Sequence, residues 1–412
     1  MPTMVSVLTM KKYQIIVFGA TGFVGKRFIQ YISHRAEFGL RHWAISGRDP
    51  KKLDRVYRTL HPSNRPEKQV ANLEDTRRID ELISESEIVI NLAGPFFQNG
   101  PNIVESCVRH KTHYLDISGE VNFGKKIIKS SHSKAVENGT CIIPFAGFDS
   151  VPADFGSFYM MEKIHQFVGE KTKQVEIVYN IGGGLNGGTF LTALGLGKNQ
   201  NYMEAHSPYN LCVDSFDIAD EYCEEEDKAH FHKNYGKWVA PFFQRSINTN
   251  VVQRSVELLS KDHQYFKLPF YYNEYWNPTN SFNKVSAKGV SWAQKLADFA
   301  FQKKALHPLL KRFGPKSGEG PSDLSIERGH FAAHIFAITE SGSLFKAQMK
   351  SSGDPSNKST VKLLAASLHC MIKNKNSLPG GVRTAASAFK MDLYDSLKSQ
   401  NISITVPTLC HK

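Results

Sequence analysis

No segment of this sequence has the length and apolar character of a membrane-spanning helix. Such a helix needs about 18 or more apolar residues without charges, and no stretch of the 412 residues approaches that pattern. The N-terminal sequence MPTMVSVLTMKK is mildly apolar, but its lysines follow the apolar part and it has no small-residue cleavage site, unlike a secretory signal. We therefore expect a chain that is neither transmembrane nor secreted.

Cysteine is also scarce, and no two of its residues form a C-x-x-C pair. The six are Cys107, Cys141, Cys212, Cys223, Cys370 and Cys410. Separated cysteines fit free thiols in a reducing compartment, which predicts an intracellular protein. Cys107 and His110 share the end of a predicted helix, whereas His113 begins a strand and no fourth zinc ligand is near, so we expect no metal site.

Clusters of positive charge are absent, although the chain is basic. Lys and Arg number 51 against 39 Asp and Glu, a formal net charge of +12. These charges are spread along the sequence rather than grouped with aromatic residues, which argues against nucleic-acid binding. They remain suited to phosphate groups or an anionic membrane surface. The pattern does not indicate an oligomeric state.

The first 150 residues alternate short apolar runs with segments of helical length. Strands are expected at 13–20, 42–48, 87–94, 113–119 and 141–148, and helices at 24–36, 51–60, 73–84, 99–111 and 122–138. Several of the strands are apolar on both faces, as in a parallel sheet covered on both sides. The pattern predicts an α/β fold in which residues 11–150 form a Rossmann-type doubly wound parallel sheet that binds NAD(P).

Beyond residue 150 the alternation fades, which predicts a second, mixed α/β domain over residues 151–390. We expect a strand at 174–181, two strands around a Ser-Gly turn after Ile335, and a helix at 359–372. The C-terminal part of this domain can return to the first domain, and residues 391–412 are expected to form a tail segment. Residues 200–290 are polar and aromatic and give no clear assignment.

Three glycines follow the first expected strand at intervals of three residues, in the sequence GATGFVG. Such a loop allows a tight turn out of the strand and a close approach of the backbone to pyrophosphate. It also points a helix N-terminus at the anion. A purely structural turn is the alternative reading, but the strand before the glycines and the helix after them favour a dinucleotide site. The expected cofactor-binding residues are Gly19, Ala20, Thr21, Gly22, Phe23 and Gly25.

The end of the second strand should decide between the two nicotinamide cofactors. An acidic residue there would hold the ribose hydroxyl of NAD, but the sequence has Arg48, whose guanidinium suits a 2′-phosphate. We therefore favour NADP(H). NAD(H) stays possible through Asp49, which can instead cap the next helix. Asn91, Gly94 and Pro95 lie at the carboxyl end of the expected strand 87–94 and are assigned to the nicotinamide half of the site.

Catalytic residues are harder to identify. Tyr159 and Lys163 form Y-x-x-x-K, a spacing that serves proton transfer in short-chain reductases, but such pairs are also common on helix surfaces. Asp116 and Glu120 bracket the end of the expected strand 113–119 and could orient substrate or relay a proton, or Glu120 could belong to a helix cap. The stretch after residue 148, DSVPADFG, is expected to position a ligand or to cap a helix.

Two further segments raise specific expectations. The glycine-rich GGGLNGGTFLTAL can bring Asn186 and Thr189 close to a substrate. Farther on, helical spacing aligns a partly apolar stripe among several lysines, and it consists of Trp292, Leu296, Phe299, Lys303 and Leu306. Core packing is the commoner fate of such a stripe, and peripheral contact with a lipid surface is the alternative.

Several motifs together resemble the saccharopine dehydrogenase-like oxidoreductases, a family that includes the bacterial trans-acting enoyl reductases. They are GATGFVG, SGR, NLAGPF, HYLDISGE, AGFDSVPADFG, GGGLNGGTFLTAL, RFGPKSGEGPS and LPGGVRTAASAF, and they extend over nearly the whole chain. The resemblance matches Gly19, Gly22, Gly25 and Arg48 to cofactor positions. It also matches Asp116, Gly119, Glu120, Asp149 and Pro152 to motif positions without an assigned catalytic role. The sequence departs from the family at GDPSN, where a Gly-Tyr pair is frequent, and at Ala385, where proline is common.

The resemblance implies an NADP(H)-dependent oxidoreductase acting on a lipid-like, hydrophobic substrate, with glycolipid metabolism as one context. It also implies a location at lipid droplets or mitochondria, with the cytosol otherwise. Two alternatives stay open: a saccharopine-type imine or semialdehyde reductase, and a non-catalytic dinucleotide-binding protein at lipid droplets.

Overall fold

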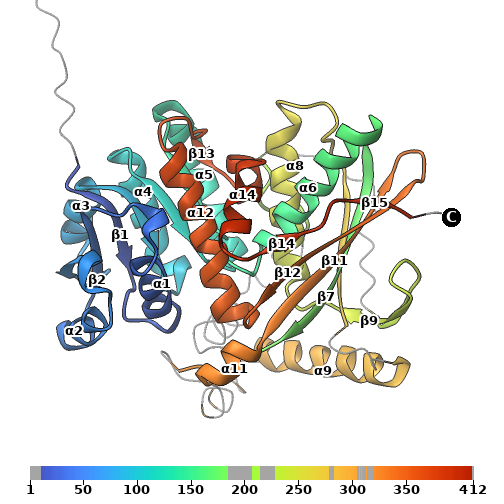
Figure 1. Ribbon diagram of the computed structural model, residues 1–412, viewed down its shortest axis with the longest axis horizontal. Coiled ribbons are helices and arrows are strands. Elements are labelled where there is room, and N and C mark those ends of the chain that lie inside the picture. Colours follow the sequence, from blue (N-terminus) through green and yellow to red (C-terminus); the bar gives the residue numbers. More distant parts are fainter. Residues whose placement is uncertain are drawn as a thin grey trace, which may run out of the picture.

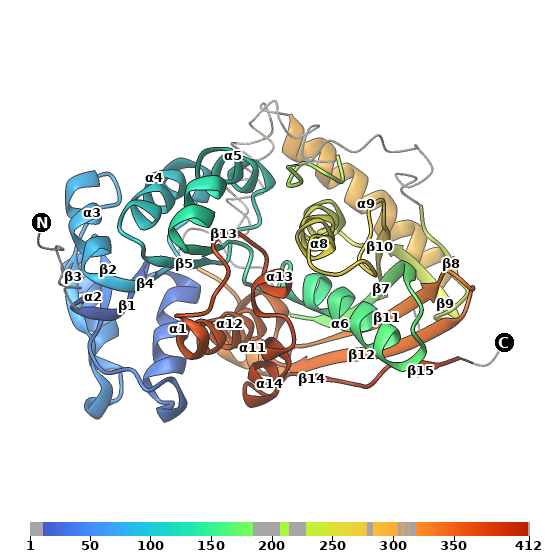
Figure 2. The same cartoon turned by 90° about the horizontal axis from the view of Figure 1, so that it is seen from above.

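A computed structural model of the chain contains two β-sheets, each flanked by helices (Figure 1). The structure describes residues 11–183, 207–213, 228–277, 283–303 and 319–410, with residues 306, 308 and 312 between the last two ranges. The first sheet and its helices occupy one half of the molecule, and the second sheet occupies the other (Figure 2). The α/β fold with a parallel Rossmann-type sheet and a second mixed domain is confirmed.

The first sheet has seven parallel strands in the order β13-β6-β5-β4-β1-β2-β3. Its strands are β1 (Tyr13–Phe18), β2 (Trp43–Gly47), β3 (Glu67–Val70), β4 (Ser86–Asn91), β5 (His113–Asp116), β6 (Cys141–Ile143) and β13 (Gly381–Val382). The helices between them are α1 (Phe23–Ser33), α2 (Pro50–Arg58), α3 (Thr76–Ser84), α4 (Phe96–Arg109) and α5 (Val121–Asn138). The elements predicted before residue 150 are present. The short strand β3 was missed because its sequence, EKQV, is polar and mostly exposed.

Both faces of this sheet are covered by helices, which explains its continuous apolar strands. In β1, Ile15 and Val17 pack into one hydrophobic cluster with residues of α1, while Ile16 and Phe18 pack into another with residues of α3, α4 and α5. Figure 2 shows α4 and α5 on one side of the strands and α1 on the other. The sheet is therefore buried on both faces, and the loops at its carboxyl edge start from buried strands.

The second sheet is mixed, with the strand order β14-β12-β11-β7-β10-β9-β8 and β15 paired with β12. Its strands are β7 (Thr172–Gly182), β8 (His230–His232), β9 (Lys237–Pro241), β10 (Tyr271–Trp276), β11 (His330–Thr339), β12 (Leu344–Ser352), β14 (Ser403–Ile404) and β15 (Thr408–Leu409). Its helices include α6 (Val151–Val168), α8 (Arg245–Ser260), α9 (Lys284–Gln302) and α11 (Asp323–Arg328). The predicted strands at 174–181 and after Ile335 correspond to β7, β11 and β12. Helix α8 and strands β8 to β10 were missed within the polar, aromatic stretch.

The chain returns from the second sheet to the first near its end. Helix α12 (Thr360–Asn374) packs against α1, and β13 extends the first sheet by pairing with β6. Two short helices follow, α13 (Ala385–Phe389) and α14 (Asp392–Ser399), and β14 and β15 then pair with β12. Residues after 380 thus contact both sheets. Among the described residues, no helix combines the length and hydropathy needed to cross a membrane.

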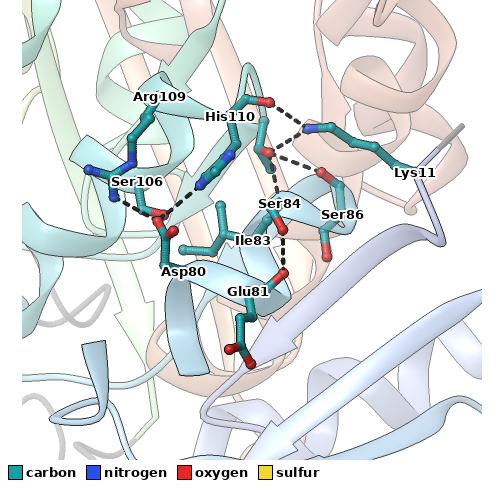
Figure 3. A network of polar contacts seen from close by, with 10 residues as sticks. Lys11, Asp80, Glu81, Ile83, Ser84, Ser86, Ser106, Arg109 and His110 are labelled. Atoms are coloured by element: carbon teal, nitrogen blue, oxygen red, sulfur yellow. Dashed lines mark hydrogen bonds and ion pairs between the residues drawn. The ribbon is translucent and has the colours of Figure 1, made fainter. Parts of the chain in front are cut away.

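A network of polar contacts stabilises the amino-terminal edge of the first sheet (Figure 3). The Asp80 carboxylate on α3 accepts hydrogen bonds from Ser106 Oγ at 2.6 Å, from Arg109 at 2.6 Å and from His110 Nε2 at 3.0 Å. Close by, Lys11 Nζ donates to the His110 carbonyl oxygen at 2.8 Å. Burial alone would raise the pKa of Asp80, but the three donors outweigh burial and lower that pKa to about 2.

This network predicts a pH-dependent contribution to stability. Because the pKa of Asp80 is lower in the folded state, its contribution is present above about pH 4 and is lost as the pH falls toward 2. The side chain is 37% exposed, so solvent screening reduces the expected loss in Asp80→Asn to about 1 kcal/mol at pH 7. Urea unfolding of wild type and variant between pH 7 and pH 3 measures this loss in the free energy of unfolding. Asp54→Asn is the control, because Asp54 forms an exposed ion pair with Lys68. A loss that does not shrink with falling pH would contradict this electrostatic origin.

Candidate active site at the carboxyl edge of the first sheet

The strand order of the first sheet reverses between β1 and β4, and the loops after these two strands meet there. Such switch points are where open α/β sheets bind ligands. Gly19 follows β1 with a φ of +78°, and a Cβ on it would lie 2.6 Å from the Leu92 carbonyl carbon. Only glycine fits this close approach of two backbones. At the switch point the loop after β1 therefore contacts the loop after β4.

The loop between β1 and α1 is folded too tightly for side chains at its glycines. A Cβ on Gly25 would lie 2.1 Å from the Gly19 carbonyl oxygen, and one on Gly22 would lie 3.2 Å from the same oxygen. Helix α1 has no side-chain cap and no acidic residue in its first turn. Its N-terminal amides and dipole thus remain suited to a phosphate group, which is the fit expected for a dinucleotide.

The other residues of this loop pack it against its neighbours. Ala20 is buried, and a methyl carbon of Thr21 lies 3.1 Å from a Cβ built on Gly47 at the end of β2. The Phe23 ring lies between the Arg27 guanidinium, 3.9 Å from its centroid, and Gly320, whose added Cβ would lie 2.4 Å from the ring. Sequence reasoning missed Gly320. The feature that could have indicated it is the repeated glycine in GEGPS, a segment about three hundred residues farther along the chain that contacts this loop in the fold.

Arg48 and Asp49 have different roles at the end of β2. Asp49 caps α2: its Oδ1 accepts hydrogen bonds from the amides of Lys51 at 2.9 Å and Lys52 at 3.1 Å. Arg48 is exposed, and within the described residues no carboxylate pairs with it. The acidic group that could compete for a ribose hydroxyl is thus used by the helix, while the guanidinium is available for a phosphate.

Glu120 holds the loop after β4 in place. Its carboxylate oxygens accept hydrogen bonds from the amides of Phe96 at 3.0 Å and Phe97 at 2.7 Å, at the start of α4. These amides come directly after Gly94 and Pro95, which are joined by a cis peptide bond. Burial raises the pKa of Glu120, and the two amides oppose that rise. Glu120 thus caps α4 rather than its own helix, and it fixes the loop assigned to nicotinamide.

Asp116 has a comparable anchoring position at the end of β5. Its Oδ1 accepts from the amides of Ser118 at 2.8 Å and Phe145 at 3.1 Å, and its Oδ2 accepts from Tyr114 Oη at 2.8 Å. Asn91 Nδ2 donates to the same tyrosine oxygen at 3.2 Å. Burial raises the pKa of Asp116 to about 6 against these donors. This carboxylate joins the ends of three neighbouring strands, and its oxygens are occupied.

Tyr159 and Lys163 lie apart from this edge, on the later turns of α6. The Tyr159 ring is buried and stacks on Tyr394, with centroids 5.4 Å apart and planes 4° from parallel. Lys163 Nζ donates to Gln166 Oε1 at 2.9 Å on the same helix. Burial raises the pKa of Tyr159 to about 12, whereas a catalytic tyrosine of the short-chain type needs a lowered pKa. The structure does not bring this pair together with the loops that carry the glycines.

A set of polar side chains does lie beside the edge, where α8 of the second domain meets the loop after β6; Asp149 is half-buried and the other three are buried. Asp149 accepts a hydrogen bond from Gln244 Nε2, and its Oδ2 lies 3.4 Å from a Cβ built on Gly119. One turn along α8, Asn248 Nδ2 donates to Glu274 Oε2 at 2.9 Å. We call Asp149, Gln244, Asn248 and Glu274 the interdomain polar cluster.

Three buried polar atoms in and beside this cluster lack a hydrogen-bond partner within the described chain: Ser150 Oγ, Gln244 Oε1 and Asn248 Oδ1. Buried polar atoms are normally paired, so unpaired ones mark a place where a ligand or water belongs. Ser150 precedes α6 without capping it through its side chain, and neither it nor Asp149 makes the predicted helix cap. Among the described residues, the cluster therefore has unpaired acceptors next to the half-buried carboxyl group of Asp149 and the buried one of Glu274.

Both carboxyl groups of the cluster keep a proton more readily than exposed ones. Burial raises the pKa of Asp149 to about 6, against the lowering effect of the Gln244 hydrogen bond. Burial raises the pKa of Glu274 to about 7, against hydrogen bonds from Tyr272, Asn248 and Tyr179. A carboxylic acid with such a pKa can deliver a proton near neutral pH.

Sequence reasoning missed Gln244, Asn248 and Glu274 because the stretch that carries them had no recognisable motif. The sequence feature that could have indicated two of them is QRSINTNVV, in which amide side chains stand four residues apart at positions where a helix usually carries its apolar stripe. Asn186 and Thr189 lie outside the described residues. Cys107, His110 and His113 do not converge: His110 contacts Asp80, and His113 Nε2 contacts the Lys375 carbonyl oxygen.

Comparison with protein families supports the cofactor assignment. Residues 15–143 match the model of the saccharopine dehydrogenase NADP binding domain. This match covers β1 through β6, including the glycine loop and Arg48. The expectation that NADP(H) is favoured is thereby confirmed.

Comparison with individual proteins extends the similarity to nearly the whole chain. A candidate trans-acting enoyl reductase of Mycobacterium tuberculosis is 28% identical, with 97% of this chain and 99% of that protein aligned. A trans-acting enoyl reductase of Mycobacterium leprae is 25% identical over 96% of this chain and 97% of that protein. Among solved structures, apo saccharopine dehydrogenase (L-Glu forming) of Saccharomyces cerevisiae matches with a TM-score of 0.53 and 11% identity, covering 97% of this chain and 100% of that chain. The last similarity concerns the fold alone.

Proposed function

Because this chain is an NAD(P)-dependent oxidoreductase similar to the saccharopine dehydrogenase-like family, we propose that it reduces an electron-poor carbon-carbon double bond of a lipid-like substrate with NADPH. The observation that carries the proposal is the interdomain polar cluster beside the carboxyl edge of the NADP-binding sheet. The names of the aligned relatives, trans-acting enoyl reductases, support the same reaction class.

The residues present fit the cofactor. The glycine loop and the start of α1 would hold the pyrophosphate, Arg48 would hold the 2′-phosphate, and the loop of Gly94 and Pro95 would support the nicotinamide. When bound, NADPH supplies a hydride from C4 of its nicotinamide. Glu120 and Asp116 act as positioning residues, because their carboxylates hold the loops through backbone amides and are already occupied.

Asp149 is our candidate for the proton donor. Reduction of a carbon-carbon double bond adds one hydride to one carbon and one proton to its neighbour. The Asp149 carboxyl group would transfer its proton to the second carbon, and the resulting carboxylate would keep the hydrogen bond from Gln244. Glu274 lies behind, and it can restore the proton through a ligand or water at the unpaired acceptors of Gln244 and Asn248.

The Phe148 ring before Asp149 belongs to the buried aromatic core, so the charges of the cluster are what bear on the substrate class. The ring of the preceding Phe148 lies 5.1 Å from that of Phe331 and 6.1 Å from that of Tyr179, which stacks on Phe242 at 4.4 Å. A substrate with several carboxylates would need converging basic groups. The described cluster instead contributes two carboxyls beside one guanidinium, Arg245. These charges favour an enoyl substrate over the imine of a saccharopine-type reaction. A location at lipid droplets or mitochondria remains a prediction of the family resemblance.

The decisive experiment offers the purified chain two substrate types with NADPH. One is a long-chain α,β-unsaturated acyl thioester, and the other is an imine formed from an amino acid and a semialdehyde. NADPH oxidation is followed by absorbance, and the product by mass spectrometry. A gain of two hydrogen atoms by the acyl chain is expected. Reduction of the imine alone, or tight NADPH binding without oxidation by either substrate, would reject the proposal in favour of one of its alternatives.

Arg48 should determine the preference for the phosphorylated cofactor. A charge-assisted hydrogen bond is worth about 1.5 to 3 kcal/mol, so Arg48→Ala should raise the Kd of NADPH by about 10- to 100-fold and leave that of NADH nearly unchanged. Calorimetric titration measures both constants. Arg41→Ala is the matched control, because Arg41 is also exposed but lies before β2, at its opposite end. An unchanged Kd of NADPH in Arg48→Ala would overturn the 2′-phosphate assignment.

A further inference from the structure

Helix α9 presents an apolar stripe to solvent. Val285 is 79% exposed, Trp292 69%, and Leu296 and Phe299 each 52%. Intervals of seven, four and three residues return to the same face of a helix, so these four side chains form one continuous row. We call this row the α9 stripe. The expectation that such a pattern packs into the core is wrong for Trp292, Leu296 and Phe299.

The opposite face of α9 explains why the stripe points outward. Ala287 is fully buried, Ser291 is 8% exposed, and Gln294 Nε2 donates to the Pro241 carbonyl oxygen at the end of β9 at 3.0 Å. These small or hydrogen-bonding side chains let α9 lie close against the second sheet. Figure 1 shows α9 along the lower edge of the molecule, outside that sheet. The large apolar side chains are therefore left on the outer surface.

Lysines accompany the stripe along its length. Lys284, Lys288, Lys295 and Lys303 are exposed, and within the described chain none of them forms an ion pair. Lys303 Nζ lies 5.1 Å from the centroid of the Phe299 ring, the arrangement of an aromatic residue beside a cation. The surface of α9 thus combines large apolar groups with exposed positive charges.

From this juxtaposition we propose that the α9 stripe is a docking surface for anionic phospholipid membranes. Protein interfaces tend to exclude lysine from their apolar centres. A helix that lies in a membrane interface instead combines Trp, Phe and Leu on one face with lysines that reach the headgroups. A second copy of the chain would bring like charges together, since four exposed lysines accompany the stripe and the chain has a net charge of +12. An anionic lipid surface complements both features.

Lipid docking is tested by flotation of the full chain with vesicles of phosphatidylcholine, with and without about 30% phosphatidylserine, which gives the vesicles the negative surface potential of an anionic leaflet. Wild type is expected to float with the anionic vesicles and to be released by high salt. The double variant Trp292→Gln, Phe299→Gln should lower the bound fraction at least tenfold, and Lys288→Gln, Lys295→Gln should abolish the preference for phosphatidylserine. Phe167→Gln is the matched control, because Phe167 is 53% exposed on α6; it should bind as wild type does.

Three outcomes would overturn docking to lipid. In the first, wild type does not float with the vesicles. In the second, the α9 variants float as well as wild type does. In the third, the chain is a dimer in solution, and the Trp292 and Phe299 substitutions dissociate it. Reduced flotation counts only for variants with wild-type unfolding curves. Because the stripe is separate from the proposed active site, the variants should keep wild-type NADPH affinity. Failure of this inference and failure of the proposed reaction can thus be told apart.

Discussion

Replacing Gly25 by alanine is expected to raise the Kd of NADPH by at least about 100-fold. The added Cβ would lie 2.1 Å from the Gly19 carbonyl oxygen, far inside van der Waals contact, and that oxygen belongs to backbone rather than to a flexible side chain. The loop and the start of α1 must therefore move apart, and the phosphate-binding amides move with them. A loss of about 3 kcal/mol in binding free energy corresponds to this change in Kd.

Two matched substitutions separate this effect from the general cost of adding a methyl group. Gly22→Ala places its Cβ 3.2 Å from the same oxygen, so a smaller loss is expected. Gly289→Ala on α9 meets no atom within 4 Å and should bind NADPH as wild type does. Calorimetry gives the three constants, and thermal unfolding shows whether each variant is folded. Wild-type affinity in folded Gly25→Ala would mean that the cofactor phosphates do not use this loop.

Replacing Asp149 by asparagine is expected to lower kcat by about 100-fold with little change in NADPH affinity. General acid catalysis contributes about 100- to 10,000-fold to enzymatic rates, and asparagine keeps the size of the side chain but supplies no acidic proton. Because burial raises the pKa of Asp149 to about 6, its protonated fraction falls tenfold per pH unit above that value. The wild-type rate should therefore decline as the pH rises above about 6, and the variant should lose this dependence.

Asp154→Asn provides a control for removing a buried carboxyl group. Burial raises the pKa of Asp154 to about 7, but its carboxylate accepts from Ser255 and, at 2.9 Å, from the Ala386 amide, away from the loop of Gly119. Its substitution should lower the melting temperature and leave the rate per folded molecule nearly unchanged. A wild-type rate and pH profile in Asp149→Asn would exclude Asp149 as proton donor. Glu274, the other carboxyl of the cluster, would then be the next residue to substitute.

Sequence and structure contributed differently to the two predicted catalytic pairs. Asp116 and Glu120 were correctly expected at the end of β5, because a strand followed by polar residues is a local pattern. The local sequence could not show that these carboxylates accept hydrogen bonds from the backbone amides of Phe145 and Phe96, because those amides belong to neighbouring loops. The spacing of Tyr159 and Lys163 was equally clear, but spacing does not reveal that Tyr159 stacks on Tyr394, more than two hundred residues away.

The sequence by itself determined the features that depend on short stretches of chain. Strand and helix periodicity indicated the parallel sheet, the spacing of Gly19, Gly22 and Gly25 predicted a phosphate-binding loop, and the placement of Arg48 predicted the preference for NADP(H). Each of these depends on backbone geometry or charge within a few neighbouring residues, so a single segment carries the information.

Only the tertiary structure decided which distant groups meet and which faces remain exposed. Asp149 joins Gln244 because the residue before α8 lies beside the loop after β6, and Asn248 joins Glu274 because α8 packs on β10. Likewise, helical spacing reveals that α9 has an apolar row but not whether the row faces the core. The small residues on its other face gave the closer packing against β9, and this left Trp292 and Phe299 in solvent.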